Sequence, residues 1–189
     1  MRRLPLWLVT LALCSPVAAL DHVHFEEVAA GFDRVTALAS VPALPEAVFV
    51  TEQIGRVRLI EQGALRGEPV LDISDRVRST GFEQGLTGLA LPPAFPAQPY
   101  LYVHYIDADQ ASVIARFELL PGPLFAADPD SEFPLLVLPQ PSPIHNCNTL
   151  VFGPDSFLYI GCGDGGPGTN PINDPQSSAN LYGKILRLD

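Results

Sequence analysis

A unit of short apolar strands separated by proline turns occurs three times along this 189-residue chain. Leu38, Leu89 and Leu150 begin the units, which are therefore 51 and then 61 residues apart. Each unit has an apolar strand that runs into a proline turn, then a second apolar strand, then a third strand with an outward arginine. These segments are residues 38–42, 48–51 and 57–60, then 89–93, 101–104 and 115–118, then 150–154, 158–161 and 186–189. A tandem repeat of this kind strongly constrains the fold.

The composition around these segments predicts an all-β protein. Twenty prolines and fifteen glycines interrupt the chain every few residues. After the first nineteen residues, no stretch of about 10–12 residues shows helical periodicity. The first two units also contain a fourth candidate strand, at residues 70–73 and 135–138, and residues 25–28 form a further candidate with no local partner.

A set of four short antiparallel strands that recurs roughly every 50 to 60 residues is typical of the blades of a β-propeller. A closed propeller needs roughly 4–8 blades, whereas this chain supplies about three. The third unit reaches Asp189 before any fourth strand. We therefore expect residues 20–189 to form the amino-terminal half of a longer propeller protein.

The first nineteen residues are typical of a secretory signal peptide. Arg2 and Arg3 give a basic end, residues 4–13 are apolar, and small residues lead to a cleavage site after Ala19. The apolar run is shorter than the roughly 20 residues that a membrane-spanning helix needs. We therefore expect a periplasmic or secreted protein without a membrane span.

The charge balance argues against nucleic acid as a partner. The chain carries 11 Lys and Arg against 21 Asp and Glu, a formal net charge of −10. Removal of the leader takes away two arginines and no acid, which leaves −12. No basic patch is available to neutralise phosphates.

A β-hairpin is predicted where two apolar runs flank residues 153–156. Proline and aspartate occupy the second and third of these positions, where a tight turn prefers them. If Phe152 faces Phe157, paired residue numbers sum to 309 and Cys147 faces Cys162. Opposed Cβ atoms lie roughly 4.5–5.5 Å apart, close to the disulfide separation of about 3.8 Å. The pair is either a disulfide or two half-buried thiols, and an oxidising compartment favours the disulfide.

His145 precedes this hairpin, and the glycine-rich residues 161–166 follow it. Glycine permits sharp turns and the close approach of a ligand. Imidazole titrates near neutral pH, so His145 is a candidate general base, with a packed or surface histidine as the alternative. Asp164, between glycines, is interpreted as a turn former. Pro167 blocks a following helix, which argues against a phosphate-binding loop.

Six motifs along the mature chain resemble the soluble pyrroloquinoline-quinone (PQQ)-dependent sugar dehydrogenases, the glucose/sorbosone dehydrogenase family. They are residues 50–60, 85–90, 101–103, His145 with 150–155, 158–166, and 183–187. The resemblance implies a six-bladed propeller, of which this chain would be the first half. It also implies oxidation of an aldose at its anomeric carbon, with hydride transfer to the quinone.

The resemblance also implies roles for individual residues. His145 matches the base that takes the proton of the sugar hydroxyl. Glu83 lies where the family places a polar residue facing the substrate, although an exposed loop acid is the alternative, and Thr169 matches a substrate contact of some members. PQQ and calcium are the implied cofactors. Their ligands belong to the second half of the family fold, beyond residue 189, so no cofactor-binding or metal-binding residue is expected here.

Departures from the family pattern leave the sugar preference open. Residues 146–149 stand where glycines are usual, and Ile144 replaces a polar residue of many glucose-active members. The implied partner is a small-molecule sugar, with a homodimer as an open alternative. A non-catalytic secreted propeller that binds a protein or a glycan is the second interpretation. Because the cofactor carries the redox chemistry, residues 1–189 alone are expected to be inactive.

Overall fold

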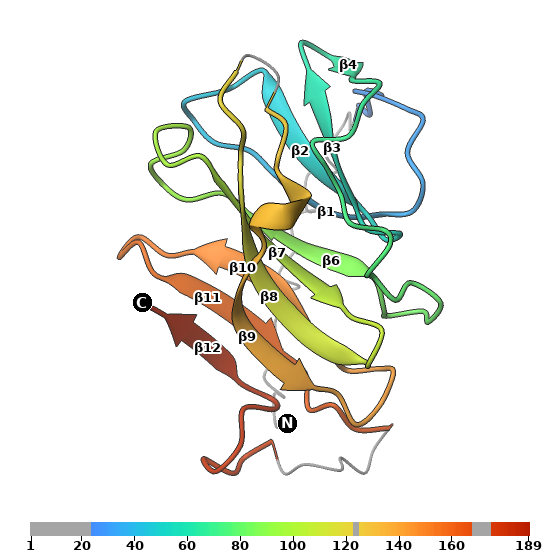
Figure 1. Ribbon diagram of the computed structural model, residues 1–189, viewed down its shortest axis with the longest axis vertical. Coiled ribbons are helices and arrows are strands. Elements are labelled where there is room, and N and C mark those ends of the chain that lie inside the picture. The colour runs from blue at the N-terminus through green and yellow to red at the C-terminus, as the bar shows by residue number, and fades with distance from the viewer. Residues whose placement is uncertain (1–23, 123–124, 168–174) are drawn as a thin grey trace, which may run out of the picture.

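Three antiparallel sheets follow one another along the chain in the computed structural model (Figure 1). The structure describes residues 24–122, 125–167 and 175–189, so the predicted signal peptide, residues 1–19, lies outside the described residues. These contain strands, turns and one 3-10 helix, η1 Pro129–Ser131, but no α-helix. Within them, no helix is both long and apolar enough to cross a bilayer. The predicted all-β class is confirmed.

Each sheet pairs strands that are mostly consecutive in the chain. The first has the order β1-β2-β3-β4, with β5 also on β3, the second β6-β7-β8-β9 and the third β10-β11-β12. The strands of the first sheet are β1 Val35–Ala39, β2 Ala47–Glu52, β3 Arg56–Glu61, β4 Ala64–Leu65 and β5 Leu71–Asp72. Those of the second are β6 Leu86–Ala90, β7 Tyr100–Ile106, β8 Ala111–Glu118 and β9 Phe133–Pro139. Those of the third are β10 Cys147–Phe152, β11 Leu158–Cys162 and β12 Ile185–Leu188. The three sheets are successive blades of a partial β-propeller.

The repeated prolines end the first strand of each sheet. Pro42, Pro92 and Pro154 follow β1, β6 and β10 by two or three residues, because proline lacks the N–H that a ladder needs. The predicted fourth strands appear as β5 and β9. Residues 25–28 form no strand, and Phe25 at their start is 88% exposed. A lone extended segment has no ladder partner to stabilise it.

Two apolar clusters fill the spaces between neighbouring sheets. Phe49 of β2 and Phe117 of β8 belong to the first cluster and have no exposed area. Ile114 of β8 and Ile160 of β11 belong to the second and are equally buried. Complete burial of such a side chain stabilises the fold by about 1.5–3 kcal/mol. The sheets are therefore packed face to face, as propeller blades are.

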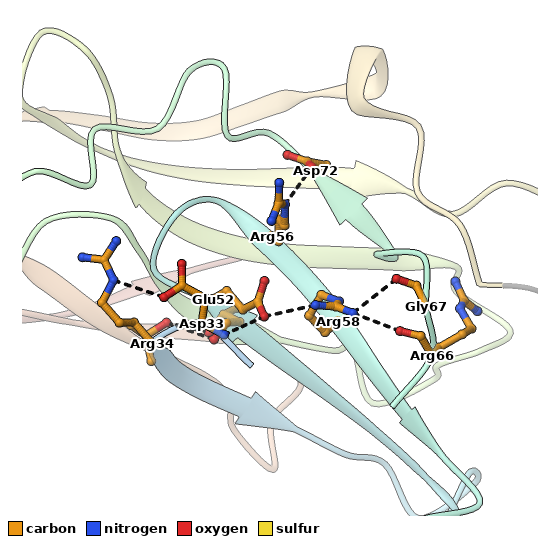
Figure 2. Close-up of polar contacts among 10 residues, drawn as sticks. Asp33, Arg34, Glu52, Arg56, Arg58, Arg66, Gly67 and Asp72 are labelled. Carbon is orange, nitrogen blue, oxygen red and sulfur yellow. Dashed lines mark hydrogen bonds and ion pairs between the residues drawn. The ribbon is translucent and has the colours of Figure 1, made fainter. Parts of the chain in front are cut away.

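A buried ion pair ties together the strands of the first sheet (Figure 2). Glu52 Oε1 accepts hydrogen bonds from Arg58 Nη1 at 3.1 Å and from the Asp33 N–H at 3.0 Å. Arg58 Nη2 donates to the carbonyl oxygens of Arg66, at 3.0 Å, and Gly67, at 3.3 Å. The side chain of Glu52 is 1% exposed and that of Arg58 13%. Each residue of the pair therefore has partners within the sheet, although Glu52 Oε2 and Arg58 Nε are buried without a hydrogen-bond partner among the described residues.

The turn between β10 and β11 is tighter than the sequence predicts. Ser156 donates its N–H to the Gly153 carbonyl at 2.9 Å, as in a β-turn, and has a positive φ of 66°. Gly153 then donates to the Phe157 carbonyl at 2.9 Å, so these two residues close the loop. Phe152 consequently faces Leu158 and not Phe157. The predicted register is wrong by one residue along most of the hairpin.

A β-bulge at Asn148 restores the predicted pairing at the far end of the hairpin. Thr149 faces Gly161, but Cys147 faces Cys162, so Asn148 is the extra residue on one strand. Cys147 and Cys162 are joined by a disulfide. The two cysteines therefore meet as the sum of 309 predicts, although the register between them and the turn is different.

Candidate active site

The residues that precede the first strands of the second and third sheets lie together. Strand β6 packs against both β1 and β10, so the first strands of the three sheets are neighbours. Glu83 precedes β6 by three residues, and His145 precedes β10 by two. The His145 N–H donates to Glu83 Oε2 at 2.6 Å. Two residues that are 62 positions apart in the sequence are therefore in direct contact.

The imidazole of His145 contacts the carboxylate of Asp164. His145 Nδ1 lies 3.1 Å from Asp164 Oδ1, which also accepts the Gly166 N–H at 3.1 Å. The pKa of Asp164 is below its ordinary value, first because of the Gly166 N–H and then because of His145. An ionised carboxylate only accepts hydrogen bonds, so Nδ1 of His145 carries the proton. Nε2 of the neutral imidazole then keeps its lone pair and can accept a proton.

The main chain of His145 is held in an uncommon conformation. Its φ is 59°, in the left-handed region that non-glycine residues seldom adopt. Its N–H donates to Glu83, and its carbonyl accepts the Gly165 N–H at 2.9 Å. A Cβ on Gly163 would lie 2.4 Å from that carbonyl oxygen, so glycine is required there. Such conformations persist where the surroundings enforce them, and they cluster at functional sites.

The loop that carries Glu83 is held in place by Gln53. Gln53 Nε2 donates to the carbonyl oxygens of Gly81 at 3.1 Å and Gln84 at 2.6 Å. Both glutamines are buried, which makes these hydrogen bonds costly to break. Gly85 has a φ of 134° and lies against Gln53, where a Cβ would clash. The position of Glu83 therefore follows from a rigid loop.

An open pocket of about 590 Å³ lies beside these groups. Its polar lining includes Glu83, His145, Asn146, Asn148 and Lys184. A smaller depression of about 230 Å³ shares Glu83, Asn146 and Asn148 and adds Thr36 and Thr87. The lining is rich in hydrogen-bonding groups, which suits a polyhydroxylated ligand better than an apolar one.

Lys184 is the only lysine in the sequence. Its Nζ donates to the carbonyl oxygens of Pro175 at 2.5 Å and Tyr182 at 2.7 Å. These bonds hold the segment that leads into β12 against the pocket. The ammonium group is thus committed to the main chain on two of its three donors.

The described residues supply a histidine, a carboxylate and a lysine to this pocket. No group of three or more His, Cys, Asp or Glu among them could hold a metal ion. A quinone that carries carboxylates calls for arginine or lysine partners. Of the described residues that line the pocket, Lys184 alone is permanently basic, and two of its donors are engaged. These residues do not by themselves form a cradle for such a cofactor.

The structure brings together two of the three predicted site residues, His145 and Glu83. The third, Thr169, lies outside the described residues. Asp164 makes the N–H bond to Gly166 that a turn former makes, and in addition it contacts the imidazole, which the sequence analysis missed. The role of Lys184 was also missed.

The contact between His145 and Asp164 could have been predicted from the register of the hairpin. Their numbers have the same sum, 309, as those of Cys147 and Cys162, which face one another. The Gly163 N–H, which donates to the Asn146 carbonyl at 3.1 Å, continues this pairing beyond the strands. Extending the predicted register by two residues would have placed Asp164 opposite His145.

Comparisons with known proteins agree with the architecture. The family model described as glucose/sorbosone dehydrogenase matches residues 33–189. A Thermus thermophilus protein assigned as an oxidoreductase (glucose dehydrogenase) is 31% identical, with a TM-score of 0.69 over 86% of this chain and 46% of its own. The PQQ-bound aldose sugar dehydrogenase of Streptomyces coelicolor, 24% identical, has the same fold, with a TM-score of 0.71 over 86% and 46% of the two chains.

A curated relative has a different kind of name. The Hedgehog-interacting protein of Mus musculus is 29% identical over 155 residues, which are 75% of this chain and 22% of that protein. The chain thus spans about half the length of the solved structures that it matches and less than a quarter of this relative.

Proposed function

Because the chain belongs to the glucose/sorbosone dehydrogenase family, we propose that it is the amino-terminal half of a PQQ-dependent aldose dehydrogenase. The family and the solved relatives support a dehydrogenase function. The reaction would oxidise the anomeric carbon of an aldose: the hydroxyl loses a proton, the C–H bond loses a hydride, and a lactone forms. The quinone, when bound, supplies the hydride acceptor.

His145 is the proposed general base. The observation that carries this proposal is the contact of Nδ1 with Asp164 at 3.1 Å beside an open polar pocket. Asp164 holds the proton on Nδ1, so Nε2 is the atom that would take the proton of the sugar hydroxyl. The carboxylate also stabilises the imidazolium that this step forms.

Glu83 is proposed to bind the substrate as well as to hold His145. Its Oε2 accepts the His145 N–H, and Oε1 has no hydrogen-bond partner among the described residues. A carboxylate oxygen at the edge of a pocket accepts a hydrogen bond from a sugar hydroxyl. Thr169 stays a proposed contact from the loop after the glycines.

The residues that bind the quinone and calcium are proposed to lie outside residues 1–189. The described part of the pocket offers one lysine, Lys184, whose ammonium already donates to two carbonyl oxygens, so further cationic partners for the quinone would come from the other half. Export to the periplasm or beyond is supported by the disulfide between Cys147 and Cys162.

The experiment is reconstitution of the full-length protein with PQQ and calcium, followed by dye reduction with a panel of aldoses. The proposal expects turnover with at least one aldose, and a large loss in a His145→Gln variant that still folds and still binds the quinone. Absence of turnover with every sugar, together with an absorption spectrum free of bound quinone, would contradict it.

The similarity to the Hedgehog-interacting protein favours a second candidate function. In this alternative the chain is part of a secreted propeller that binds a protein or a glycan and catalyses nothing. It predicts specific retention of the full-length protein on an immobilised extracellular protein or glycan, without quinone binding. A quinone-loaded protein that turns over sugars would reject it.

A further inference from the structure

We propose that the disulfide between Cys147 and Cys162 positions the catalytic groups, by holding together the two strand ends from which His145 and Asp164 extend. The inference rests on the proposed role of His145 and adds two positioning residues to it. Cys147 is the first residue of β10, and Cys162 is the last residue of β11. His145 lies two residues before the first, and Asp164 two residues after the second.

The ladder between β10 and β11 is interrupted immediately below this bond. From Phe152 to Thr149 the pairing with β11 is regular, but Asn148 is the extra residue of a β-bulge. A bulge leaves one residue unpaired and bends its strand. The disulfide joins Cys147, the residue before the bulge, to β11. It therefore keeps the two strands aligned on the far side of the bulge.

Beyond the disulfide, few contacts hold His145 opposite Asp164. Among the described residues, two main-chain hydrogen bonds join the strand ends there, from Gly163 to Asn146 at 3.1 Å and from Gly165 to His145 at 2.9 Å. Strand β10 is at the edge of its sheet, and β11 is its one ladder partner in the part of the chain that the structure describes. Without the covalent link, the contact between imidazole and carboxylate would depend on these bonds and on the Glu83 carboxylate.

The bond is protected from its surroundings. Cys147 is 1% exposed and Cys162 is 9% exposed, and both belong to the apolar cluster between the second and third sheets. Packing on one side and a covalent link on the other give the strand ends little freedom. A dyad that extends two residues beyond such an anchor keeps its geometry before substrate arrives, which is the condition for an effective base.

A disulfide that spans 15 residues also stabilises a fold by restricting the unfolded chain, so stability alone cannot test the proposal. The tautomer of the His145 imidazole can, because a merely structural bond would leave it unchanged. Asp164 selects the tautomer with the proton on Nδ1. If the strand ends separate, the imidazole loses this partner and samples both tautomers.

The test uses the full-length protein with 15N-labelled histidine and long-range proton–nitrogen correlation spectra, in which a His145→Gln variant assigns the signals. A Cys147→Ala/Cys162→Ala variant is compared with Leu150→Ala, which removes packing from β10 but leaves the strand ends bonded. We expect the single Nδ1–H tautomer in the native protein and in Leu150→Ala, and a tautomer mixture in the cysteine variant. With quinone and sugar, kcat of the cysteine variant should fall by roughly 10- to 100-fold.

A Cys147→Thr/Cys162→Val variant leaves a smaller gap than the alanine pair and places β-branched side chains, which strands favour, opposite one another. It replaces the alanine pair if that pair does not fold. A native tautomer in a folded variant without the disulfide would overturn the proposal. Absence of turnover in a native protein that shows the Nδ1–H tautomer would instead contradict the proposed function, so the two failures are distinguishable.

Discussion

Two acid–base pairs occupy corresponding places in the first and third sheets. Glu52 ends the second strand of the first sheet and pairs with Arg58 at 3.1 Å (Figure 2). Asp164 follows the second strand of the third sheet and contacts His145, also at 3.1 Å. In both pairs the carboxylate additionally accepts a main-chain N–H.

The two pairs differ in how exposed they are and in whether they line a pocket. We call Glu52 with Arg58 the closed pair and His145 with Asp164 the open pair. The side chains of Glu52 and Arg58 are 1% and 13% exposed, and Arg58 also donates to two carbonyl oxygens. The side chains of Asp164 and His145 are 23% and 39% exposed, His145 lines the pocket, and Nε2 of its imidazole has no hydrogen-bond partner among the described residues. A pair buried away from any pocket serves the fold, whereas a partly exposed pair at a pocket can serve proton transfer.

The largest expected effect is on activity, in the open pair. A His145→Gln variant keeps a polar side chain but removes the group that accepts the proton. We expect kcat for aldose oxidation to fall by about 10³-fold, or roughly 4 kcal/mol in the barrier. Dye reduction at saturating sugar measures this loss, and thermal denaturation should show little change in stability. A variant within a few-fold of the native rate would remove His145 from the role of base.

The next effect is on stability, in the closed pair. Arg58→Met leaves Glu52 buried with only the Asp33 N–H as partner, so we expect a loss of about 3 kcal/mol in the free energy of unfolding. Urea denaturation of the full-length protein measures it. The double variant Glu52→Gln/Arg58→Met should recover part of the loss, because no buried charge remains, and kcat of the folded protein should not change. Equal instability of the single and double variants would contradict the assignment.

The three sheets were predictable because their signals are local. Proline ends strands wherever it occurs, and the period of the apolar runs repeats three times, so β1, β6 and β10 could be placed within a few residues. The cysteine pair was predicted from the register of the hairpin, and it is correct although that register is wrong along most of the two strands. The turn after Phe152 and the bulge at Asn148 were not predictable, because each shifts the register by one residue and the two shifts cancel at the cysteines.

The site was less predictable because its contacts are distant in sequence. The bond from the His145 N–H to Glu83 depends on how the second and third sheets pack. The left-handed conformation of His145 likewise follows from its surroundings and has no sequence signature. Burial of Glu52 with Arg58 has the same origin, since both residues look like solvated strand positions in the sequence.

A third basic group, His104, sharpens the contrast between buried and open sites. It is fully buried in β7, where Nδ1 lies 2.7 Å from Thr87 Oγ1. Burial lowers its pKa from 6.5 to about 3, so the imidazole is neutral in the fold and charged in the unfolded chain at mildly acidic pH. The stabilisation is complete above pH 6.5 and is lost as the pH falls toward 3.

This difference in pKa predicts that the free energy of unfolding falls by about 3 kcal/mol between pH 7 and pH 4 because of His104 alone. Urea denaturation at several pH values measures the slope, and a His104→Gln variant, which cannot titrate, isolates the contribution. The variant should lose less stability than the native protein over the same range. Identical slopes for the two proteins would show that His104 does not titrate differently on unfolding.

The smallest expected effect separates the charge of the open pair from its geometry. In an Asp164→Asn variant, the amide oxygen can still accept the Nδ1–H of His145, so the tautomer can persist while the negative charge is lost. We expect kcat to fall on the order of 10-fold, less than on removal of the imidazole. Asp155→Asn, on the exposed turn of the same hairpin, is the matched control, since its carboxylate bonds Tyr159 away from the pocket. A native kcat in Asp164→Asn, or an equal loss in the control, would show that the charge of Asp164 contributes nothing to the proton transfer and that Asp164 only orients the imidazole.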